Sequence, residues 1–331
     1  MITPLARFLD WSAIQAVTLM IPAQSDNPRL EEAIEFLKSP DFVPADSQPA
    51  QVEFNGPLDF HFRTPLPSEF MENNVVHGRF YCCGKRWQER PVVILLHGSG
   101  DSLNYKFRFP LIARRCNRAG LNAASLVAPY HFQRRPRQLG GSLFYSDMLQ
   151  FAQAMAQAIV EVRALTGWLL REGCPAVALW GISLGANSAG MTACCDSRLA
   201  AVVLNSPLPR MVPWLAERAV RPSIRRQLPI GLKHCEELNL TVLNLTMTRP
   251  AIPRDGILLI EGIHDLMSPK DGIEDLWQSW GQTDIWRLPH GHVGVCCGFV
   301  PGLPERVLRW LAPRLDATPT VAKTTRCGVN K

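Results

Sequence analysis

Residues 178–187 read ALWGISLGAN and place Ser183 between Gly181 and Gly185, directly after an apolar run. The apolar run predicts a buried strand, and the small residues after Ser183 predict a helix that packs close to it. A G-x-S-x-G pattern between a strand and a helix is typical of a strained turn that exposes a serine Oγ. Larger side chains at the two glycine positions would collide with the strand and the helix. We therefore interpret Ser183 as a candidate nucleophile.

Two later strand ends supply the acid and the base that such a serine needs. GILLIEG (256–262) is a predicted strand that leads to Asp265, and DIWRLP (284–289) is a predicted strand that leads to His292. Residues at the carboxyl ends of parallel strands meet at one edge of a sheet, where ligands bind. The order serine, acid, histidine is the one that accompanies this type of turn. The sequence therefore predicts that Ser183, Asp265 and His292 are catalytic.

Other residues compete for these roles. His290 is a rival base, but Pro289 restricts the backbone there, whereas Gly291 gives His292 a freer approach. Asp271 follows a Pro-Lys pair and is predicted to lie in the first turn of a helix, where carboxylates favour the helix dipole. Asp284 stands at the start of its strand, at the opposite edge of the sheet. We favour Asp265 and His292.

The segment LLHGSGD (95–101) predicts the fourth part of the site. It ends a buried strand in a glycine-bracketed turn that can present a backbone N–H toward the nucleophile. Together with the N–H of Leu184, the N–H of Ser99 is predicted to form an oxyanion hole, with that of Gly100 as the alternative. His97 is predicted to be a packing residue at the strand end.

Buried strands alternate with helices from residue 91 onward, which predicts a mostly parallel, doubly wound sheet. Two short strands in 51–64 and 75–90 predict an antiparallel N-terminal edge. The predicted core strands and helices are 91–98, 108–120, 121–129, 146–173, 176–181, 199–207, 256–262, 271–281, 284–289 and 304–315. The helix 146–173 is predicted to be amphipathic. The fold class is therefore α/β.

Three regions divide the chain. Residues 1–50 are predicted to be an N-terminal helical segment and a Pro-rich connector, residues 51–316 the α/β domain, and residues 317–331 a flexible tail. In the first region, 25–38 is a predicted helix with Leu30, Ala33, Ile34 and Leu37 on one face, and 11–21 is a predicted docking helix, too short to span a membrane.

Residues 208–254 interrupt the alternation and are predicted to form a helical cap above the strand ends. In MVPWLAERAV (211–220), Met211, Trp214, Leu215 and Arg218 recur at helical spacing. Trp214 is therefore a predicted substrate-binding residue. The alternative is a helix that only covers the edge of the sheet.

Composition narrows the class of protein. The 331 residues carry a modest net charge of +6 without a basic stripe, which argues against nucleic-acid binding. Arg134, Arg135 and Arg137 are predicted to lie in a solvated loop. The ten cysteines form no C-x-x-C pair and are predicted to be reduced, mostly buried thiols. We expect no metal, no cofactor, no stable membrane insertion and a cytoplasmic location.

With these pieces assembled, residues 75–315 resemble the α/β-hydrolase superfamily. Within it, the chain resembles the abhydrolase-domain-containing protein 18-like group, near the dienelactone-hydrolase-like enzymes. The resemblance rests on AASLVAPYHFQRRPRQ (123–138), LFYSDMLQFAQAMAQAIVEVRALTGWL (143–169) and LWGISLGANSAGMTA (179–193). Leu184 replaces a methionine often seen at the turn. The resemblance implies a Ser-His-Asp hydrolase whose residues are Ser183, His292 and Asp265.

The predicted function is therefore that of a serine hydrolase that cleaves a carboxylic ester or a related small acyl substrate through an acyl-enzyme. An acyltransferase would use the same residues and differ only in the group that removes the acyl chain. A non-catalytic binding protein of the same fold is a third interpretation, which an intact set of Ser183, Asp265 and His292 argues against.

Overall fold

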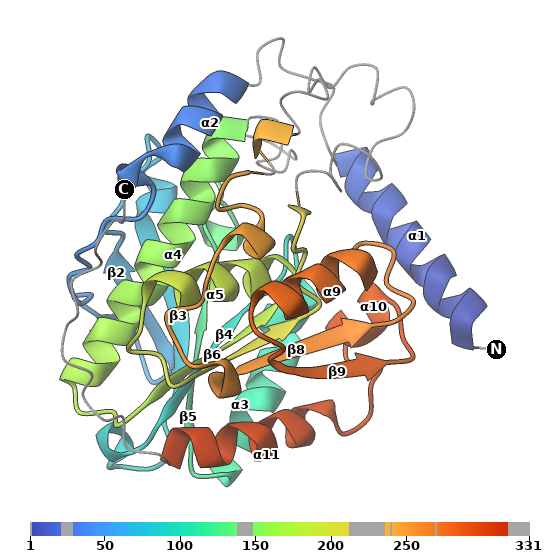
Figure 1. The fold of residues 1–331 in the computed structure, drawn as a ribbon. Helices are drawn as coiled ribbons and strands as arrows, with labels where there is room; N and C mark the ends of the chain where they lie inside the picture. The colour runs from blue at the N-terminus through green and yellow to red at the C-terminus, as the bar shows by residue number, and fades with distance from the viewer. Residues whose placement is uncertain are drawn as a thin grey trace.

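The computed structural model describes residues 2–20, 29–137, 148–211, 236–238, 240–268 and 270–316. Its centre is a nine-stranded sheet in the order β1-β2-β3-β5-β4-β6-β7-β8-β9 (Figure 1). The strands are β1 Glu53–Phe54, β2 Asp59–Arg63, β3 Val75–Tyr81, β4 Val92–Leu96, β5 Asn122–Leu126, β6 Val177–Ile182, β7 Ala201–Asn205, β8 Ile257–Gly262 and β9 Asp284–Leu288.

Strand direction divides the sheet into two parts. The pairs β1–β2, β2–β3 and β3–β5 are antiparallel, and every pair from β5 through β4 to β9 is parallel. Every residue of β4 to β8 is buried, as expected of strands covered on both faces. The predicted doubly wound sheet with an antiparallel N-terminal edge is confirmed.

Helices cover both faces of the sheet. Their bounds are α1 Ile2–Met20, α2 Leu30–Lys38, α3 Phe109–Arg118, α4 Met148–Arg171, α5 Leu184–Cys195, α9 Lys270–Ser279, α10 His292–Cys296 and α11 Leu303–Asp316. Ile94 and Leu96 face a core shared with α4 and α5, whereas Val93 and Leu95 face a core shared with α3 and α11. Alternate residues of one strand thus serve two cores.

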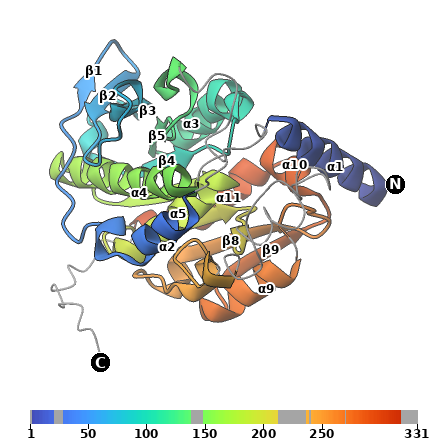
Figure 2. The same ribbon diagram turned by 90° about the horizontal axis from the view of Figure 1, so that it is seen from above.

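The long helix α4 departs from its predicted amphipathic character. Within 148–169, only Gln153 is exposed. The N-terminal region provides the cover: α2 packs on α4, as Figures 1 and 2 show, with the predicted face of α2 buried. The connector adds a hydrogen bond from the Ala50 amide to the Ala164 carbonyl, 2.9 Å. The prediction was wrong because residues far away in sequence bury the outer face.

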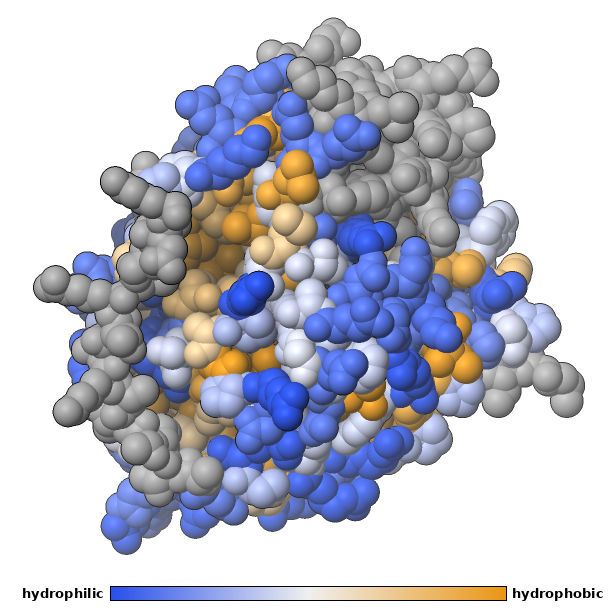
Figure 3. All heavy atoms as spheres, viewed as in Figure 1, coloured by the Kyte–Doolittle hydropathy of each residue, from blue (hydrophilic) through white to orange (hydrophobic). Residues whose placement is uncertain are grey.

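Two surface features also differ from expectation. The eight cysteines in the described part of the chain are free thiols, but Cys82 and Cys195 are exposed and only Cys116, Cys174 and Cys296 are buried. The exposed thiols lie at the ends of elements, Cys82 just after β3 and Cys195 at the last residue of α5. The prediction of mostly buried cysteines was therefore wrong. On the face seen in Figure 3, the surface over α9 is largely hydrophilic, in keeping with its polar sequence.

The N-terminal helix is longer than predicted, since α1 begins at Ile2, whereas the apolar stretch suggested 11–21. It lies beside α10 in both ribbon views (Figures 1 and 2). None of the described helices combines the length and apolar character needed to cross a bilayer.

The predicted cap falls partly outside the described residues. Residues 212–235, which include Trp214, Leu215 and Arg218, and the tail 317–331 belong to the part on which the structure is silent. The described beginning of the predicted cap is anchored to α5. The buried Asn187 side chain accepts a hydrogen bond from the Leu208 N–H at 2.9 Å and donates one to the Leu208 C=O at 2.8 Å. The cap helix itself stays a prediction.

Candidate active site

Ser183 occupies the turn between β6 and α5 in a strained backbone conformation. Its φ of 53° and ψ of −120° are rarely adopted by a residue with a side chain. A Cβ added at Gly181 would strike the backbone of Gly185, and one added at Gly185 would strike the backbone carbonyl of Leu96. Gly181 thus allows β6 and α5 to approach each other, and Gly185 allows α5 to approach the end of β4. The sequence pattern therefore corresponds to the geometry it predicts.

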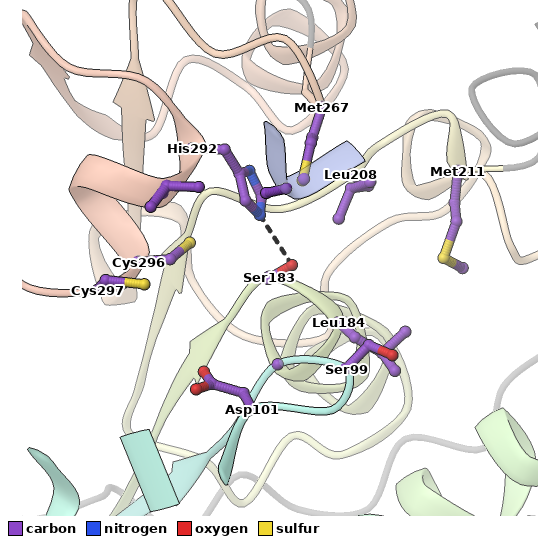
Figure 4. Close-up of a pocket in the computed structure, with 13 residues that line it drawn as sticks. Ser99, Asp101, Ser183, Leu184, Leu208, Met211, Met267, His292, Cys296 and Cys297 are labelled. Carbon is purple, nitrogen blue, oxygen red and sulfur yellow. Dashed lines mark hydrogen bonds between the residues drawn. The ribbon is translucent and has the colours of Figure 1, made fainter. Parts of the chain in front are cut away.

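The structure brings Ser183, His292 and Asp265 into one hydrogen-bonded line. His292 Nε2 lies 3.0 Å from Ser183 Oγ, as the dashed line in Figure 4 marks. On the other side of the ring, His292 Nδ1 lies 2.8 Å from Asp265 Oδ2. Asp265 follows β8, and His292 follows β9 as the first residue of α10. Three strand ends thus place these side chains within contact distance.

Asp265 is held in place by the turn that it begins. Its Oδ1 accepts hydrogen bonds from the amides of Met267 and Ser268, each at 2.7 Å, which leaves Oδ2 directed at the imidazole. Burial by itself would lower the pKa of His292, but the Asp265 carboxylate, and after it Cys296, outweigh this effect, and the pKa of His292 lies well above its ordinary value. The contact therefore favours a proton on His292.

The rival residues lie elsewhere. Asp271 is exposed in the first turn of α9, as predicted. The Asp284 carboxylate is exposed at the start of β9 and accepts hydrogen bonds from Trp310 and Arg314. His290 lies two residues before α10, where its carbonyl accepts a hydrogen bond from the His264 amide, 3.1 Å. Of the residues considered, His292 is the one that contacts Ser183, and Asp265 is the one that contacts His292.

The predicted oxyanion residues flank Ser183. Ser99 and Leu184 line the same cavity and lie on the side of Ser183 that is turned away from His292 (Figure 4). Leu184 is the first residue of α5, and the amides of a helix's first turn have no partner within that helix. The position of Leu184 thus suits an N–H that receives negative charge.

His97 holds the turn that carries Ser99. Its Nε2 accepts a hydrogen bond from the Ala128 amide at 3.0 Å, so the proton is on Nδ1, which donates to the Gly98 carbonyl at 2.7 Å. Burial lowers the pKa of His97 to about 4, which keeps the ring neutral near pH 7. A planar trans peptide directs the Ser99 N–H opposite to the Gly98 C=O. His97, predicted as a packing residue, therefore also fixes the direction of the Ser99 N–H.

Ser183 opens into a cavity of about 260 Å³ whose wall is mostly apolar. The apolar residues that line it are Ala13, Leu184, Leu208, Met211, Met267 and Val293, together with the thiols Cys296 and Cys297. Leu208 and Met211 come from the beginning of the predicted cap, so part of that segment does reach the cavity. Trp214 lies outside the described residues.

Several residues of this wall were not predicted from the sequence, among them Asp101, Ala13 and Cys296. Asp101 lines the cavity from the turn after β4, where its carboxylate accepts a hydrogen bond from the Asn104 amide at 3.0 Å. Ala13 reaches the cavity from α1, and Cys296 from one turn after His292. The close spacing of Cys296 to His292, and of Asp101 to the predicted oxyanion turn, could have identified two of them. In the part of the chain that the structure describes, no three His, Cys, Asp or Glu side chains gather as metal ligands would.

The prediction that Arg134 lies in a solvated loop is wrong. Arg134 is fully buried, although Arg137 from the same run is exposed. Its guanidinium forms two hydrogen bonds with the Glu161 carboxylate of α4, at 2.6 and 2.7 Å. The solvated loop was the wrong interpretation for this arginine because its partner lies 27 residues away on a helix that packs over it.

The sheet order, the strained serine turn and the strand-end residues are those of an α/β hydrolase. A family model described as alpha/beta hydrolase domain containing 18 matches residues 24–222, and the chain belongs to that family. The matched region contains Ser99, Ser183 and Leu184 and ends before Asp265 and His292.

Two curated relatives match about half of this chain. Two uncharacterized proteins of Mycobacterium tuberculosis are each 29% identical to this chain over 180 residues, which is 53% of this chain. The match covers 43% of their length, so this chain spans less than half of the relatives it matches.

Solved structures share the fold at low identity. An acetyl xylan esterase from a Paenibacillus species is 16% identical, with a TM-score of 0.56, and the match covers 90% of this chain and 98% of that one. An esterase of Pyrococcus furiosus is 17% identical, with a TM-score of 0.54 and coverage of 81% and 98%. These similarities establish the α/β-hydrolase fold.

Proposed function

We propose that the protein is a serine hydrolase that cleaves a carboxylic ester or a related acyl substrate. The observation that carries the proposal is the hydrogen-bonded line from Ser183 through His292 to Asp265 at the wall of an apolar cavity. The names of the similar structures, esterases and an acetyl xylan esterase, favour ester chemistry over other reactions of this fold.

In the first half of the reaction, Ser183 Oγ attacks the acyl carbonyl carbon while His292 Nε2 takes the hydroxyl proton. Asp265 holds Nδ1–H, so that Nε2 is the free acceptor, and stabilises the imidazolium that forms. The negative charge that develops on the carbonyl oxygen is received by the amides of Ser99 and Leu184. Collapse of the tetrahedral intermediate breaks the ester C–O bond, and His292 returns the proton to the leaving alcohol.

In the second half, water removes the acyl group from Ser183. His292 takes a proton from the water, the resulting hydroxide attacks the acyl-enzyme carbonyl, and the same two amides receive the charge. Ser183 recovers its proton from His292 as the carboxylic acid leaves. The cavity walls, which include Leu208, Met211 and Met267, favour an apolar acyl group.

Labelling with a fluorophosphonate, combined with assays on p-nitrophenyl esters of graded chain length, tests the proposal. Ser183→Ala is expected to abolish labelling and to lower kcat by about 10⁴- to 10⁶-fold while the fold stays intact. Ser188→Ala is a matched control, because Ser188 lies one turn further along α5 and its Oγ only donates to the Leu184 carbonyl, 3.3 Å. The control should label like the wild type.

The outcomes separate the alternatives. A wild-type protein that neither labels nor hydrolyses any ester would favour a non-catalytic binding protein and overturn the proposal. Labelling with little hydrolysis, relieved by an added alcohol or amine, would favour acyl transfer. Labelling that persists in Ser183→Ala would move the nucleophile to another residue.

A further inference from the structure

The N-terminal helix α1 places a carboxylate beside the candidate base. Asp10 is fully buried, and it shares the inward face of α1 with Ala6 and Ile14, which are also buried and lie four residues to either side. The outward face carries the exposed side chains of Leu5 and Phe8. Figures 1 and 2 both show α1 running alongside α10, the helix that begins at His292.

Both carboxylate oxygens of Asp10 are engaged by backbone amides of the site. Oδ2 accepts the His292 amide at 2.8 Å and the Leu266 amide at 3.0 Å, and Oδ1 accepts the Val293 amide at 2.9 Å. Leu266 directly follows Asp265. One side chain from the start of the chain therefore holds the backbone of the base and the backbone next to the acid.

The local sequence explains why this anchor is needed. The residue before α10 is Gly291, which has no side chain to cap the first amides of the helix. Asp10 supplies that cap from another helix. The approach is close, because a Cβ added at Gly291 would lie 2.7 Å from an Asp10 carboxylate oxygen. Asp10 precedes residues 24–222, the part matched by the family model.

We propose that Asp10 is a positioning residue that sets the distance between His292 and Asp265, so that α1 is part of the catalytic apparatus. The inference rests on the proposed hydrolase function. Burying a carboxylate costs free energy that an apolar side chain would not incur. A helix that merely covered α10 would not need one at this position. The three hydrogen bonds that Asp10 accepts from backbone amides explain its presence.

α1 has further contacts with the same site. Thr3 Oγ1 lies 3.2 Å from His264 Nε2, next to Asp265, and Ala13 lines the cavity that contains Ser183. The helix thus touches the loop of the acid, the helix of the base and the wall of the cavity. Displacement of α1 would disturb all three, and Asp10 is the contact that bears on His292 directly.

The test compares Asp10→Ala and Asp10→Asn with two changes on the same helix. Asp10→Ala is expected to lower kcat by roughly 10- to 100-fold with little change in KM, since a small misplacement of a catalytic group costs about that much. The kcat of Asp10→Asn should lie between those of the wild type and Asp10→Ala, because the asparagine keeps one acceptor oxygen but turns an NH₂ group toward a backbone amide. It also serves where Asp10→Ala folds poorly.

Ile14→Ala and Phe8→Ala are the controls. Ile14→Ala removes buried apolar contacts and should lower Tm without a comparable loss of kcat at temperatures where the protein is folded. Phe8→Ala changes an exposed side chain and should alter neither quantity measurably. A loss of kcat in Ile14→Ala as large as that in Asp10→Ala would overturn the proposal, because helix stability alone would then explain the effect.

A second readout does not depend on turnover. The proton between His292 Nδ1 and Asp265 should give a far-downfield ¹H resonance in the wild type, which Asp10→Ala should broaden or shift upfield. The acid limb of kcat/KM should also move to lower pH, because a weaker contact with Asp265 raises the pKa of His292 less. Unchanged resonance and kcat in a folded Asp10→Ala would overturn the inference. A wild type without esterase activity would instead count against the proposed function.

Discussion

Two of the buried ionisable pairs in the described part of the chain differ in what their polar groups contact. Arg134 and Glu161 pair where α4 packs beside the end of β5, and Asp265 and His292 pair in the segments that follow β8 and β9. Arg134 directs its N–H groups at the Glu161 carboxylate and at the backbone carbonyls of Asn73 and Val127. His292 gives one nitrogen to Asp265 and turns the other toward Ser183 in the cavity.

The comparison teaches that burial and pairing alone do not identify a reactive group. Both pairs are withdrawn from water, and both are held by side chains from separate elements. Only the pair of Asp265 and His292 has a nitrogen that can both gain and lose a proton, and that nitrogen faces Ser183 in the cavity. We therefore expect changes to the first pair to affect stability and changes to the second to affect turnover.

Replacing the acid should separate the two pairs most clearly. Asp265→Asn keeps the shape but leaves His292 with the wrong tautomer, so kcat should fall by about 10³- to 10⁴-fold. Asp271→Asn, in the exposed first turn of α9, is the matched control and should change kcat less than about tenfold, the scale of a surface change. The reverse ranking in steady-state assays would move the acid to Asp271.

The pH profile of Asp265→Asn tests the direction in which Asp265 shifts the pKa of His292. The base must be neutral to accept a proton, and Asp265 raises the pKa of His292, so wild-type kcat/KM should fall as the pH drops through a value above 6.5, the ordinary pKa of histidine. Removing the carboxylate should move this acid limb to lower pH while the maximum falls. A limb that stays in place would argue against the contact of Asp265 with His292.

Breaking the pair of Arg134 and Glu161 should lower stability and leave kcat nearly unchanged. Glu161→Ala leaves the Arg134 charge buried and uncompensated, which should lower the free energy of unfolding by about 3–5 kcal/mol. The kcat of the molecules that remain folded should stay near the wild-type value. Denaturant unfolding measures the first quantity and active-site titration corrects the second.

A double variant completes that test. Arg134→Met combined with Glu161→Leu replaces the pair by apolar side chains and should recover much of the lost stability, as buried pairs often allow. A large loss of kcat in the folded double variant would show that this pair also supports the reaction. It would then no longer contrast with Asp265 and His292.

The fold could be predicted from the sequence because its signals are local. Continuous apolar runs mark the buried strands, and the glycines at 181 and 185 mark the serine turn. The structure places Asp265 and His292 at the two strand ends where the sequence predicted them. Each of these predictions needed only a few neighbouring residues and the rule that parallel strands end at one edge.

What could not be predicted depends on contacts between distant residues. Nothing near Asp10 in the sequence indicates that its carboxylate meets amides 256 and more positions away. The burial of Arg134 by Glu161, and of α4 by α2, likewise depends on how elements pack. The left-handed backbone at Ser183 was predictable because a sequence motif encodes it, whereas the contacts of Asp10 with His292 and of Arg134 with Glu161 have no such motif.

The smallest expected effect is that of changing Met211, at the wall of the cavity that His292 faces. Met211 is buried, lines the cavity and belongs to the start of the predicted cap. Met211→Ala should enlarge the cavity and shift the preference in the ester panel toward longer acyl chains by a few-fold, about 1 kcal/mol per methylene. It should leave the pH profile unchanged, because neither His292 nor Asp265 is touched. Met247→Ala is the matched control, since Met247 is exposed in the same 208–254 segment. Equal relative rates across the panel for Met211→Ala and the wild type would reduce Met211 to a packing residue and place the acyl chain elsewhere in the cavity.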